Sequence, residues 1–156
     1  MIVTRLATSN DAEGIQTVVD TAFATVRDVY HPKPDAVPTS ENANLDSKTI
    51  VALANGEIVG AICIYQDATA LHVSQLAVVP NFRKRGVARL LMQAASEAAI
   101  ECGANQLRLN TIQETGNVAI FQRLGFTVET TIEATWCISD RFPELNEVSM
   151  TRQCSS

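Results

Sequence analysis

An Asn-Gly pair at positions 55 and 56 is the sequence feature that most constrains the fold, because it separates two apolar runs. The runs cover residues 49–54 and 58–65. Asn and Gly tolerate the positive φ angles that both central positions of a tight hairpin turn require. A third apolar run, residues 70–79, ends at Pro80. The three runs therefore predict an antiparallel meander of β-strands.

Around this meander, apolar residues recur with helical spacing in two segments. The first, residues 15–26, follows helix-capping residue types at positions 8–11. The second, residues 85–102, stops before Gly103, a common helix terminator. The other predicted elements are strands at 2–6, 107–112, 126–138 and 148–152, a short helix at 116–124 and a loop at 31–48. This order predicts a mixed α/β fold whose mostly antiparallel central sheet is flanked by helices.

Length and composition narrow the class of protein. The 156 residues predict a single domain over 1–156, and 46% hydrophobic with 19% charged residues is typical of a globular protein. The net charge of -5 argues against a nucleic-acid partner. The sequence lacks an apolar run of the ~18 residues that a membrane-spanning helix needs. We therefore expect neither nucleic acid nor a membrane among the partners.

The four cysteines, at positions 63, 102, 137 and 154, form no CxxC pair and, with two histidines, no zinc-ligand spacing. We therefore predict no metal site and interpret Cys63 and Cys102 as small core residues. Unpaired cysteines suit a reducing compartment. Because residues 1–5 also lack the charged and apolar regions of a signal peptide, we expect a cytoplasmic protein.

A basic cluster marks the boundary between the third strand and the second long helix. Four of the twelve basic residues fall within residues 83–89 of an otherwise acidic chain. A helix N-terminus has unpaired N–H groups and a partial positive charge, and Gly86 would let a ligand approach the backbone closely. These features predict a phosphate site, although charge alone fits a solvated basic turn equally well. GxxxxGK[ST] and GxGxxG are absent, which argues against P-loop and dinucleotide sites.

Residues 76–91 resemble the acyl-CoA-binding motif of the GCN5-related N-acetyltransferase (GNAT) family, [RQ]-x-x-G-x-[GA], here Arg83, Gly86 and Ala88. Residues 117–126 resemble the later helix of that family and its Leu-Gly-Phe ending. The resemblance covers essentially the whole chain. It implies the GNAT acyl-CoA N-acyltransferase fold, with acetyl-CoA as co-substrate and direct acetyl transfer to a primary amine of a small molecule or peptide. It also allows a homodimer. A non-catalytic acyl-CoA-binding domain of the same fold is the alternative.

The resemblance also implies which residues bind acetyl-CoA. The pantetheine arm is expected in a gap where a strand splays at a bulge, and the pyrophosphate on the N–H groups of residues 84–89. Aligning the Leu-Gly-Phe ending places Glu114 where the family has an Asn, but we favour Asn117. The residues expected to contact acetyl-CoA are Leu76, Ala77, Val78, Arg83, Lys84, Arg85, Gly86, Val87, Ala88, Arg89, Asn117 and Phe121.

The acid–base positions depart from the family pattern. Phe121 matches the tyrosine that often serves as acid, and Ser74 matches a position that is often acidic. His72 is the candidate catalytic base, since a histidine side chain ordinarily titrates near neutral pH and His72 shares a face with Ser74 if the strand is regular there. A histidine without a chemical role is the alternative.

Some other residues are weaker candidates. Glu129 and Glu133 could reach the cleft or bind a cation, although solvated carboxylates are the alternative. Residues 30–32 open the long loop and either face the acceptor or anchor the loop. Tyr65, Phe82 and Trp136 are interpreted as packing residues.

Overall fold

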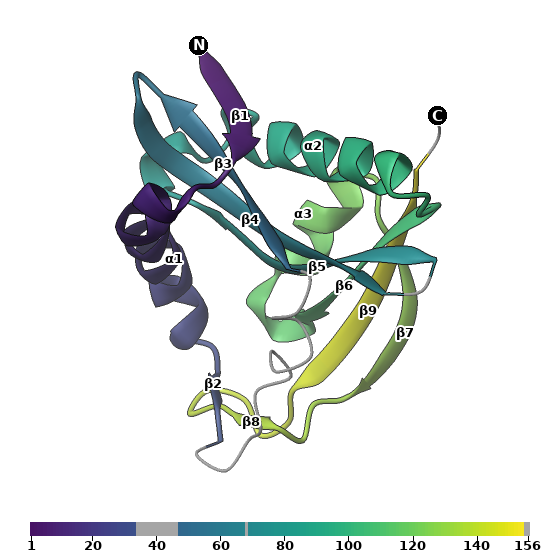
Figure 1. The fold of residues 1–156 in the computed structure, drawn as a ribbon. Coiled ribbons are helices and arrows are strands. Elements are labelled where there is room, and N and C mark those ends of the chain that lie inside the picture. Colours follow the sequence, from purple (N-terminus) through teal and green to yellow (C-terminus); the bar gives the residue numbers. More distant parts are fainter. Residues whose placement is uncertain (34–46, 68, 155–156) are drawn as a thin grey trace.

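The computed structural model describes residues 1–33, 47–67 and 69–154 (Figure 1). Within these ranges the main sheet has seven strands in the order β1-β3-β4-β5-β6-β9-β7. Every neighbouring pair is antiparallel except β5 and β6, which are parallel. The strands are β1 (Ile2–Leu6), β3 (Lys48–Ala54), β4 (Glu57–Asp67), β5 (Ala70–Val78), β6 (Gln106–Ile112), β7 (Thr127–Glu133) and β9 (Asn146–Gln153).

The predicted meander is confirmed by β3, β4 and β5. The turn between β3 and β4 uses positive φ at both central residues, 53° at Asn55 and 83° at Gly56. Antiparallel registers then join β3 to β4 and β4 to β5. This meander is the part of the sheet against which the long helices pack.

Helices cover both faces of the sheet. Helix α1 (Ala12–Arg27) packs on one face, where Val18 and Ala22 contact Ala77 of β5. Helices α2 (Val87–Glu101) and α3 (Asn117–Arg123) belong to the other face, with the main core. Short 3-10 turns occur at Ser9–Asp11, Pro80–Phe82 and Gln113–Thr115.

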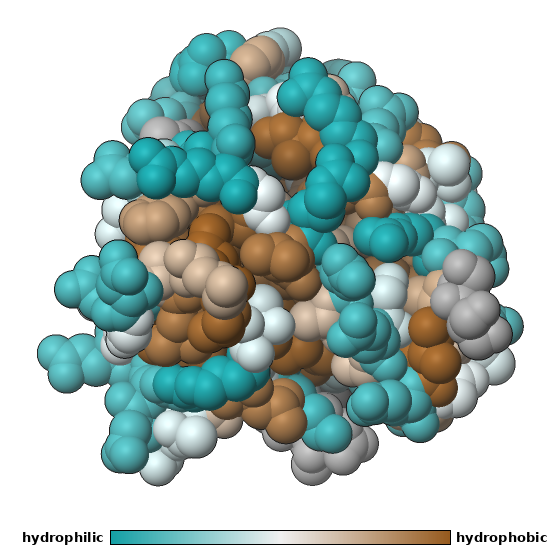
Figure 2. All heavy atoms as spheres, turned by 90° about the horizontal axis from the view of Figure 1, so that it is seen from above, coloured by the Kyte–Doolittle hydropathy of each residue, from teal (hydrophilic) through white to brown (hydrophobic). Residues whose placement is uncertain are grey.

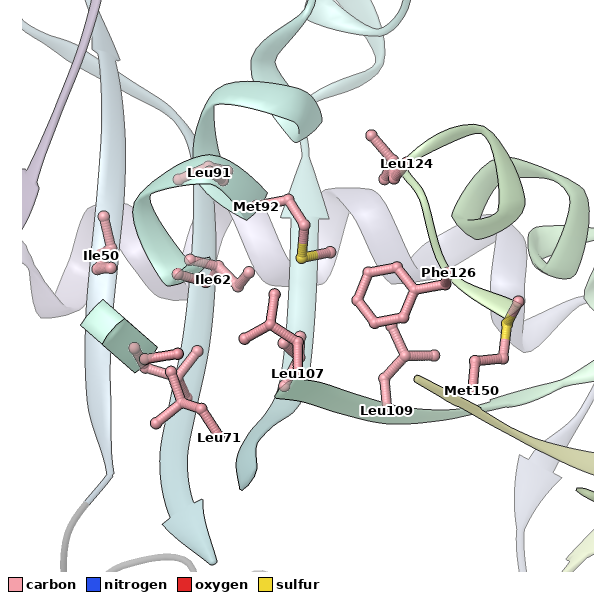
Figure 3. Packing of buried hydrophobic residues seen from close by; sticks show 14 of the residues in the cluster. Ile50, Ile62, Leu71, Leu91, Met92, Leu107, Leu109, Leu124, Phe126 and Met150 are labelled. Carbon is pink, nitrogen blue, oxygen red and sulfur yellow. The ribbon is translucent and has the colours of Figure 1, made fainter. Parts of the chain in front are cut away.

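The main core lies between the sheet and the α2–α3 layer (Figure 3). Leu91 and Met92 of α2 are fully buried against Ile62 of β4 and Leu107 of β6. Phe126 extends the same core from the chain after α3. Because α2 is held by this packing, its N-terminus has a defined position relative to β4 and β5.

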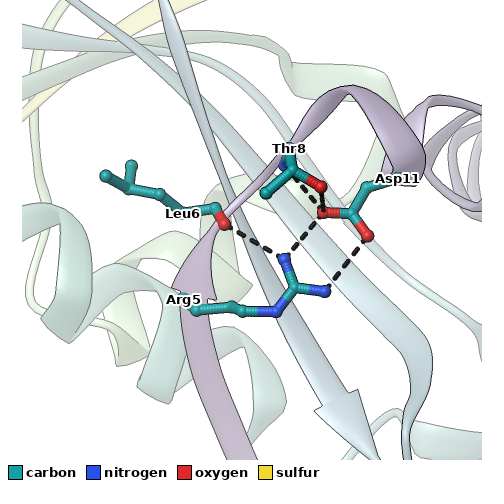
Figure 4. A network of polar contacts seen from close by, with 4 residues as sticks. All are labelled: Arg5, Leu6, Thr8 and Asp11. Atoms are coloured by element: carbon teal, nitrogen blue, oxygen red, sulfur yellow. Dashed lines mark hydrogen bonds and ion pairs between the residues drawn. The ribbon is translucent and has the colours of Figure 1, made fainter.

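The junction between β1 and α1 is closed by a polar network (Figure 4). Arg5 donates from Nη1 and Nη2 to both carboxylate oxygens of Asp11, at 2.7 and 3.1 Å. The backbone N–H of Thr8 donates to the same carboxylate at 2.7 Å. The bond with Arg5 has the larger effect and that with Thr8 the next, and together they hold the pKa of Asp11 well below its usual range. The network therefore fixes where α1 leaves the sheet.

Two predicted boundaries are wrong. The second long helix begins at Val87 rather than residue 85, because Gly86 is left-handed (φ 81°). The predicted strand at 126–138 is broken after Glu133, where the Ala134 N–H donates to the Leu145 carbonyl at 2.8 Å. Its last residues form β8 (Cys137–Ile138), which pairs with β2 (His31–Pro32) in a separate two-stranded sheet.

The small sheet has a physical cause. Ala134 and Cys137 are both buried in a satellite cluster with Ile112 and Leu145. A spacing of three residues cannot place both side chains on one face of a regular strand. The segment predicted as a loop, residues 31–48, begins with the strand β2. Residues 34–46 of this segment lie outside the described residues.

The surface carries apolar areas bordered by hydrophilic side chains, as the face seen from above shows (Figure 2). Val3 and Leu6 of the edge strand β1 are among the exposed large apolar residues. Cys102 is also exposed, so its interpretation as a core residue is wrong. No helix within the described ranges is long and apolar enough to cross a membrane.

Candidate functional site

The site is built around the point where β5 and β6 separate. The two strands pair only from Ala70 to His72 on β5 and from Gln106 to Arg108 on β6. Beyond that point β5 continues beside β4 to Val78, while β6 continues beside β9 to Ile112. The sheet is therefore split between its two halves.

A β-bulge lies at the split. The β4–β5 register steps from Ile64↔Val73 to Cys63↔Gln75, so Ser74 is an extra residue on β5. The hydroxyl of Ser74 donates to the Cys63 carbonyl at 3.3 Å. The strand is therefore not regular at Ser74, and the condition under which His72 and Ser74 share a face is not met.

The alternation of the β4–β5 ladder decides which backbone groups face the split. The Val79 N–H donates to the Val59 carbonyl at 3.0 Å, and Ala77 lies two residues before Val79, opposite Ala61. In an antiparallel ladder, residues two apart point their N–H and C=O groups to the same neighbour. Ala77 therefore directs its groups toward β4, whereas Leu76 and Val78 direct theirs toward the split. Leu76, Ala77 and Val78 were predicted to contact the pantetheine arm. The backbone groups of Ala77 face β4 rather than the gap.

A cavity of about 470 Å³ occupies the split. Its walls come from β4, β5, β6, α1, α3 and the segments around β8 and β9. The residues that line it include Phe23, Tyr30, Cys63, Tyr65, His72, Ser74, Leu76, Asn110, Asn117, Phe121, Trp136 and Glu147. Cys63 therefore lines the cavity and is only half-buried, rather than a core residue.

The turn before α2 presents a row of backbone N–H groups. Lys84 and Gly86 adopt positive φ angles of 65° and 81°. The first bond of the helix runs from the Leu90 N–H to the Gly86 carbonyl, at 3.0 Å. Within the described residues, no hydrogen-bond acceptor lies in bonding geometry with the N–H groups of residues 84–89. Such a row, at the positive end of a helix, suits a phosphate group.

The side chains of this turn divide into two sets. Arg83, Lys84, Arg85 and Arg89 are exposed. Nη2 of Arg83 donates to the Ala22 carbonyl of α1 at 3.3 Å, and the Arg85 guanidinium lies 5.2 Å from the ring centroid of half-buried Phe82. Val87 points into the core with 1% exposure, so only its backbone faces the turn, and Ala88 is half-buried.

The start of α3 distinguishes the two candidates for the second motif. Asn117 is the first residue of α3 and lines the cavity. Glu114 does not line it, because its carboxylate accepts from the backbone and side-chain N–H groups of Asn146, at 2.6 and 3.2 Å. Phe121 also lines the cavity and packs edge-on against Phe126, with centroids 6.0 Å apart.

Aromatic side chains form two pairs in the cavity wall. The rings of Tyr65 and His72 are stacked, with centroids 4.9 Å apart and planes at 19°. Tyr30 and Trp136 meet edge to face at 5.7 Å. Both pairs line the cavity, so Tyr65 and Trp136 are wall residues as well as packing residues. Of residues 30–32, Tyr30 reaches the cavity, while His31 and Pro32 pair with β8.

The acidic candidates need a correction. Glu129 forms an exposed ion pair with Arg108 at 3.1 Å, and neither Glu129 nor Glu133 lines the cavity. The carboxylate that does line it, Glu147 on β9, was missed by the sequence analysis. The alternation with buried Val148 and Met150 was the available signal, because it places Glu147 on the opposite face of β9.

The described residues contain no group of three or more His, Cys, Asp or Glu side chains placed to hold a metal ion. A Cβ added at Gly86 would meet no heavy atom within 4 Å, so the turn leaves open space at the point where a ligand would contact the backbone. The open row of N–H groups and the split beside it therefore fit a phosphorylated ligand with a long, uncharged arm.

Comparisons with known proteins identify relatives of this chain. A family model described as "Acetyltransferase (GNAT) domain" matches residues 12–137. Streptothricin acetyltransferase from Streptomyces lavendulae is 31% identical over 96 residues, covering 59% of this chain and 51% of that protein. N-alpha-acetyltransferase 30 from Schizosaccharomyces pombe is 32% identical over 84 residues, covering 50% of this chain and 56% of that protein. The chain spans about half the length of these relatives.

Solved structures share the fold. Nourseothricin acetyltransferase is 24% identical, with a TM-score of 0.75, and the match covers 99% of both chains. A Bacillus anthracis protein solved in complex with acetyl coenzyme A is 14% identical, with a TM-score of 0.74 over 98% of this chain and 99% of that one. At these identities the likeness concerns the fold alone.

Proposed function

The chain belongs to the GNAT acetyltransferase family, and from this premise we propose that it transfers an acetyl group from acetyl-CoA to a primary amine. The observation that carries the proposal is the open row of N–H groups at residues 84–89, beside a cavity that passes through the split sheet. The acceptor is the amine of a small molecule or of a peptide. One relative is named for streptothricin and another as an N-alpha-acetyltransferase.

The proposed donor site uses backbone more than side chains. The pyrophosphate of acetyl-CoA binds the N–H groups of residues 84–89, and the exposed Arg83, Lys84, Arg85 and Arg89 add positive charge. The pantetheine arm enters the split, where the backbone groups of Leu76 and Val78 face it. Asn117 and Phe121 line the same space from α3.

The proposed reaction is direct attack of a neutral amine on the thioester. A C–N bond forms, the C–S bond breaks, CoA leaves as a thiolate, and the proton lost by the amine neutralises that thiolate directly or through the enzyme. The N–H groups of Leu76 and Val78 are positioned to donate to the carbonyl oxygen as negative charge develops on it. His72 is the candidate base, since its ring lines the cavity in a stack with Tyr65.

A second candidate function is acyl-CoA binding without catalysis. Phe121 favours it, because it offers no hydroxyl to the leaving thiolate where many family members have a tyrosine. Ser74 favours it too, because its hydroxyl bonds the Cys63 carbonyl. A thiolate is a fairly good leaving group without an acid, and orientation alone contributes a large share of many rate enhancements, so we rank transfer first.

A thiol-release assay with a panel of amines separates the two functions. Transfer predicts that at least one small-molecule or peptide amine raises CoA release above hydrolysis, with the acetylated amine found by mass spectrometry. Tight acetyl-CoA binding without stimulation by any amine would instead establish the binding function. A single domain over residues 1–156, a cytoplasmic location and a homodimer stay predictions of the sequence.

A further inference from the structure

The wall of the cavity carries one carboxylate. Of the described residues that line the cavity, Glu147 is the sole acidic one, and none is lysine or arginine. Glu147 is half-buried, and no described side chain forms a hydrogen bond or ion pair with it. A half-buried carboxylate without a partner is costly unless a ligand or solvent satisfies it.

The surroundings of Glu147 are apolar. Its directly opposite neighbours on the sheet are Ile112 of β6 and Ile132 of β7. Ile112 is buried in the cluster against which Tyr30 packs, and Tyr30 meets Trp136 edge to face. The carboxylate therefore has apolar neighbours on both adjacent strands.

Glu147 forms no ion pair with a cation among the described residues, although Lys33 and Arg27 also lie close enough to lower the pKa of Cys137. The Arg27 guanidinium lies over the Tyr30 ring, 5.2 Å from its centroid, and forms no ion pair with Glu147. Burial first, and then the charge of Glu147, raise the pKa of Cys137. Among the described residues that line the cavity, Glu147 therefore carries the one formal charge, whereas the turn at residues 84–89 is positive.

Glu147 lies on the face of the sheet opposite the α2–α3 layer. Leu109 and Met150 belong to the core on the α2–α3 side, and Glu147 alternates with that set on β9. Its partner Ile112 is four residues beyond Arg108, the partner of His72, which is about 13 Å along a strand. The carboxylate is therefore separated from His72 and from the point where the sheet divides.

This separation matters chemically. The attacking nitrogen must be neutral, and a carboxylate beside it would stabilise its ammonium form and oppose attack. A carboxylate at a distance binds a different charge, one that persists through the reaction. Resting on the proposed acetyl transfer, we propose that Glu147 binds a second cationic nitrogen, so that the preferred acceptor is a diamine or a larger molecule with two amino groups.

Binding to the CoA-loaded protein tests this without turnover. Calorimetric titrations use a series of α,ω-diamines of increasing length and the monoamines of the same length. We expect the best diamine to bind at least about tenfold more tightly than its matched monoamine. Glu147→Gln removes that preference. Glu144→Gln, an exposed glutamate outside this cavity, is the matched control and retains it.

Kinetics distinguish the roles that the carboxylate could have. For a diamine that serves as substrate, Glu147→Gln raises KM about tenfold and leaves kcat unchanged, because the distant charge is bound equally in substrate and transition state. Equal binding of diamines and monoamines by the native protein overturns the proposal. So does a fall in kcat for both classes, since the carboxylate would then act at the reacting nitrogen. If no amine is acetylated, the proposed transfer function is wrong. The calorimetric titrations still decide whether Glu147 binds a second cationic nitrogen.

Discussion

A Cβ atom added at Gly60 of β4 would lie 2.9 Å from Cγ1 of Val87, the first residue of α2. It would also lie 3.1 Å from Cδ1 of Leu91 and 3.2 Å from the Ala77 carbonyl oxygen. Gly60 therefore allows the start of α2 to approach the sheet closely. The position of the N–H row that precedes Val87 depends on that approach.

Gly60→Ala tests this dependence. We expect the free energy of unfolding to fall by about 1–3 kcal/mol, because the added methyl group overpacks a buried contact. We also expect weaker CoA binding, because the start of α2 must move. Urea unfolding and CoA titration measure the two effects. Gly14→Ala is the control, since its Cβ meets the flexible end of Ile58 at 3.0 Å, and CoA affinity should not change.

Gly86→Val tests the phosphate site. Gly86 and Gly103 flank the two ends of α2 with φ of 81° and 84°, and neither has a heavy atom within 4 Å of an added Cβ. Valine at either position should cost a similar ~1–2 kcal/mol in backbone strain. We expect the dissociation constant for CoA to rise at least about tenfold for Gly86→Val alone. An equal loss of affinity in Gly103→Val would contradict the site.

Two substitutions at His72 separate chemistry from packing. His72→Phe keeps an aromatic ring for the stack with Tyr65, whereas His72→Ala loses both ring and base. If His72 is the base, both variants lower kcat, by about 10²–10⁴-fold, without changing CoA affinity. The acid limb of the pH–rate profile should also disappear in His72→Phe. A His72→Phe variant with native kcat would show that the ring serves packing alone.

The Arg5–Asp11 pair predicts a loss of stability in acid. The folded-state pKa of Asp11 is depressed, so the unfolded chain takes up the proton first as pH falls. The stabilisation is therefore complete above the unfolded pKa of about 4 and is lost as pH falls through the folded value. We expect Asp11→Asn to lower the Tm at neutral pH, with the difference from the native protein shrinking in acid. Asp20→Asn on α1 is the control, because its carboxylate bonds uncharged Gln16; a similar pH-dependent difference there would argue against a specific role of Asp11.

Some elements could be predicted because their signals are local. The turn at Asn55 and Gly56 needs positive φ at both residues, and few other residues supply it cheaply. The helical spacing of α1 and α2 and the glycine before α2 are also local, as is the basic turn. The resemblance of this turn, and of the Leu-Gly-Phe sequence after α3, to family motifs indicated acetyl-CoA as the ligand.

Other features depend on distant contacts. The break after Glu133 follows from burial of Ala134 and Cys137 beneath Tyr30, which is about a hundred residues earlier in the chain. Asn117 rather than Glu114 lines the cavity, because the Glu114 carboxylate is bonded to the backbone N–H of Asn146. Neither partner is visible in the local pattern.

By itself, the sequence determined the meander and the presence of the helices, because each depends on backbone preferences over a few residues, and its motifs indicated the family. The tertiary structure alone decided which groups face the cavity. The bulge at Ser74 exchanges the faces of β5, the ladder turns the backbone of Ala77 away from the split, and the pairing of β9 between β6 and β7 brings Glu147 to the cavity wall. These are consequences of register, and register is set by pairing between strands that are far apart in the chain.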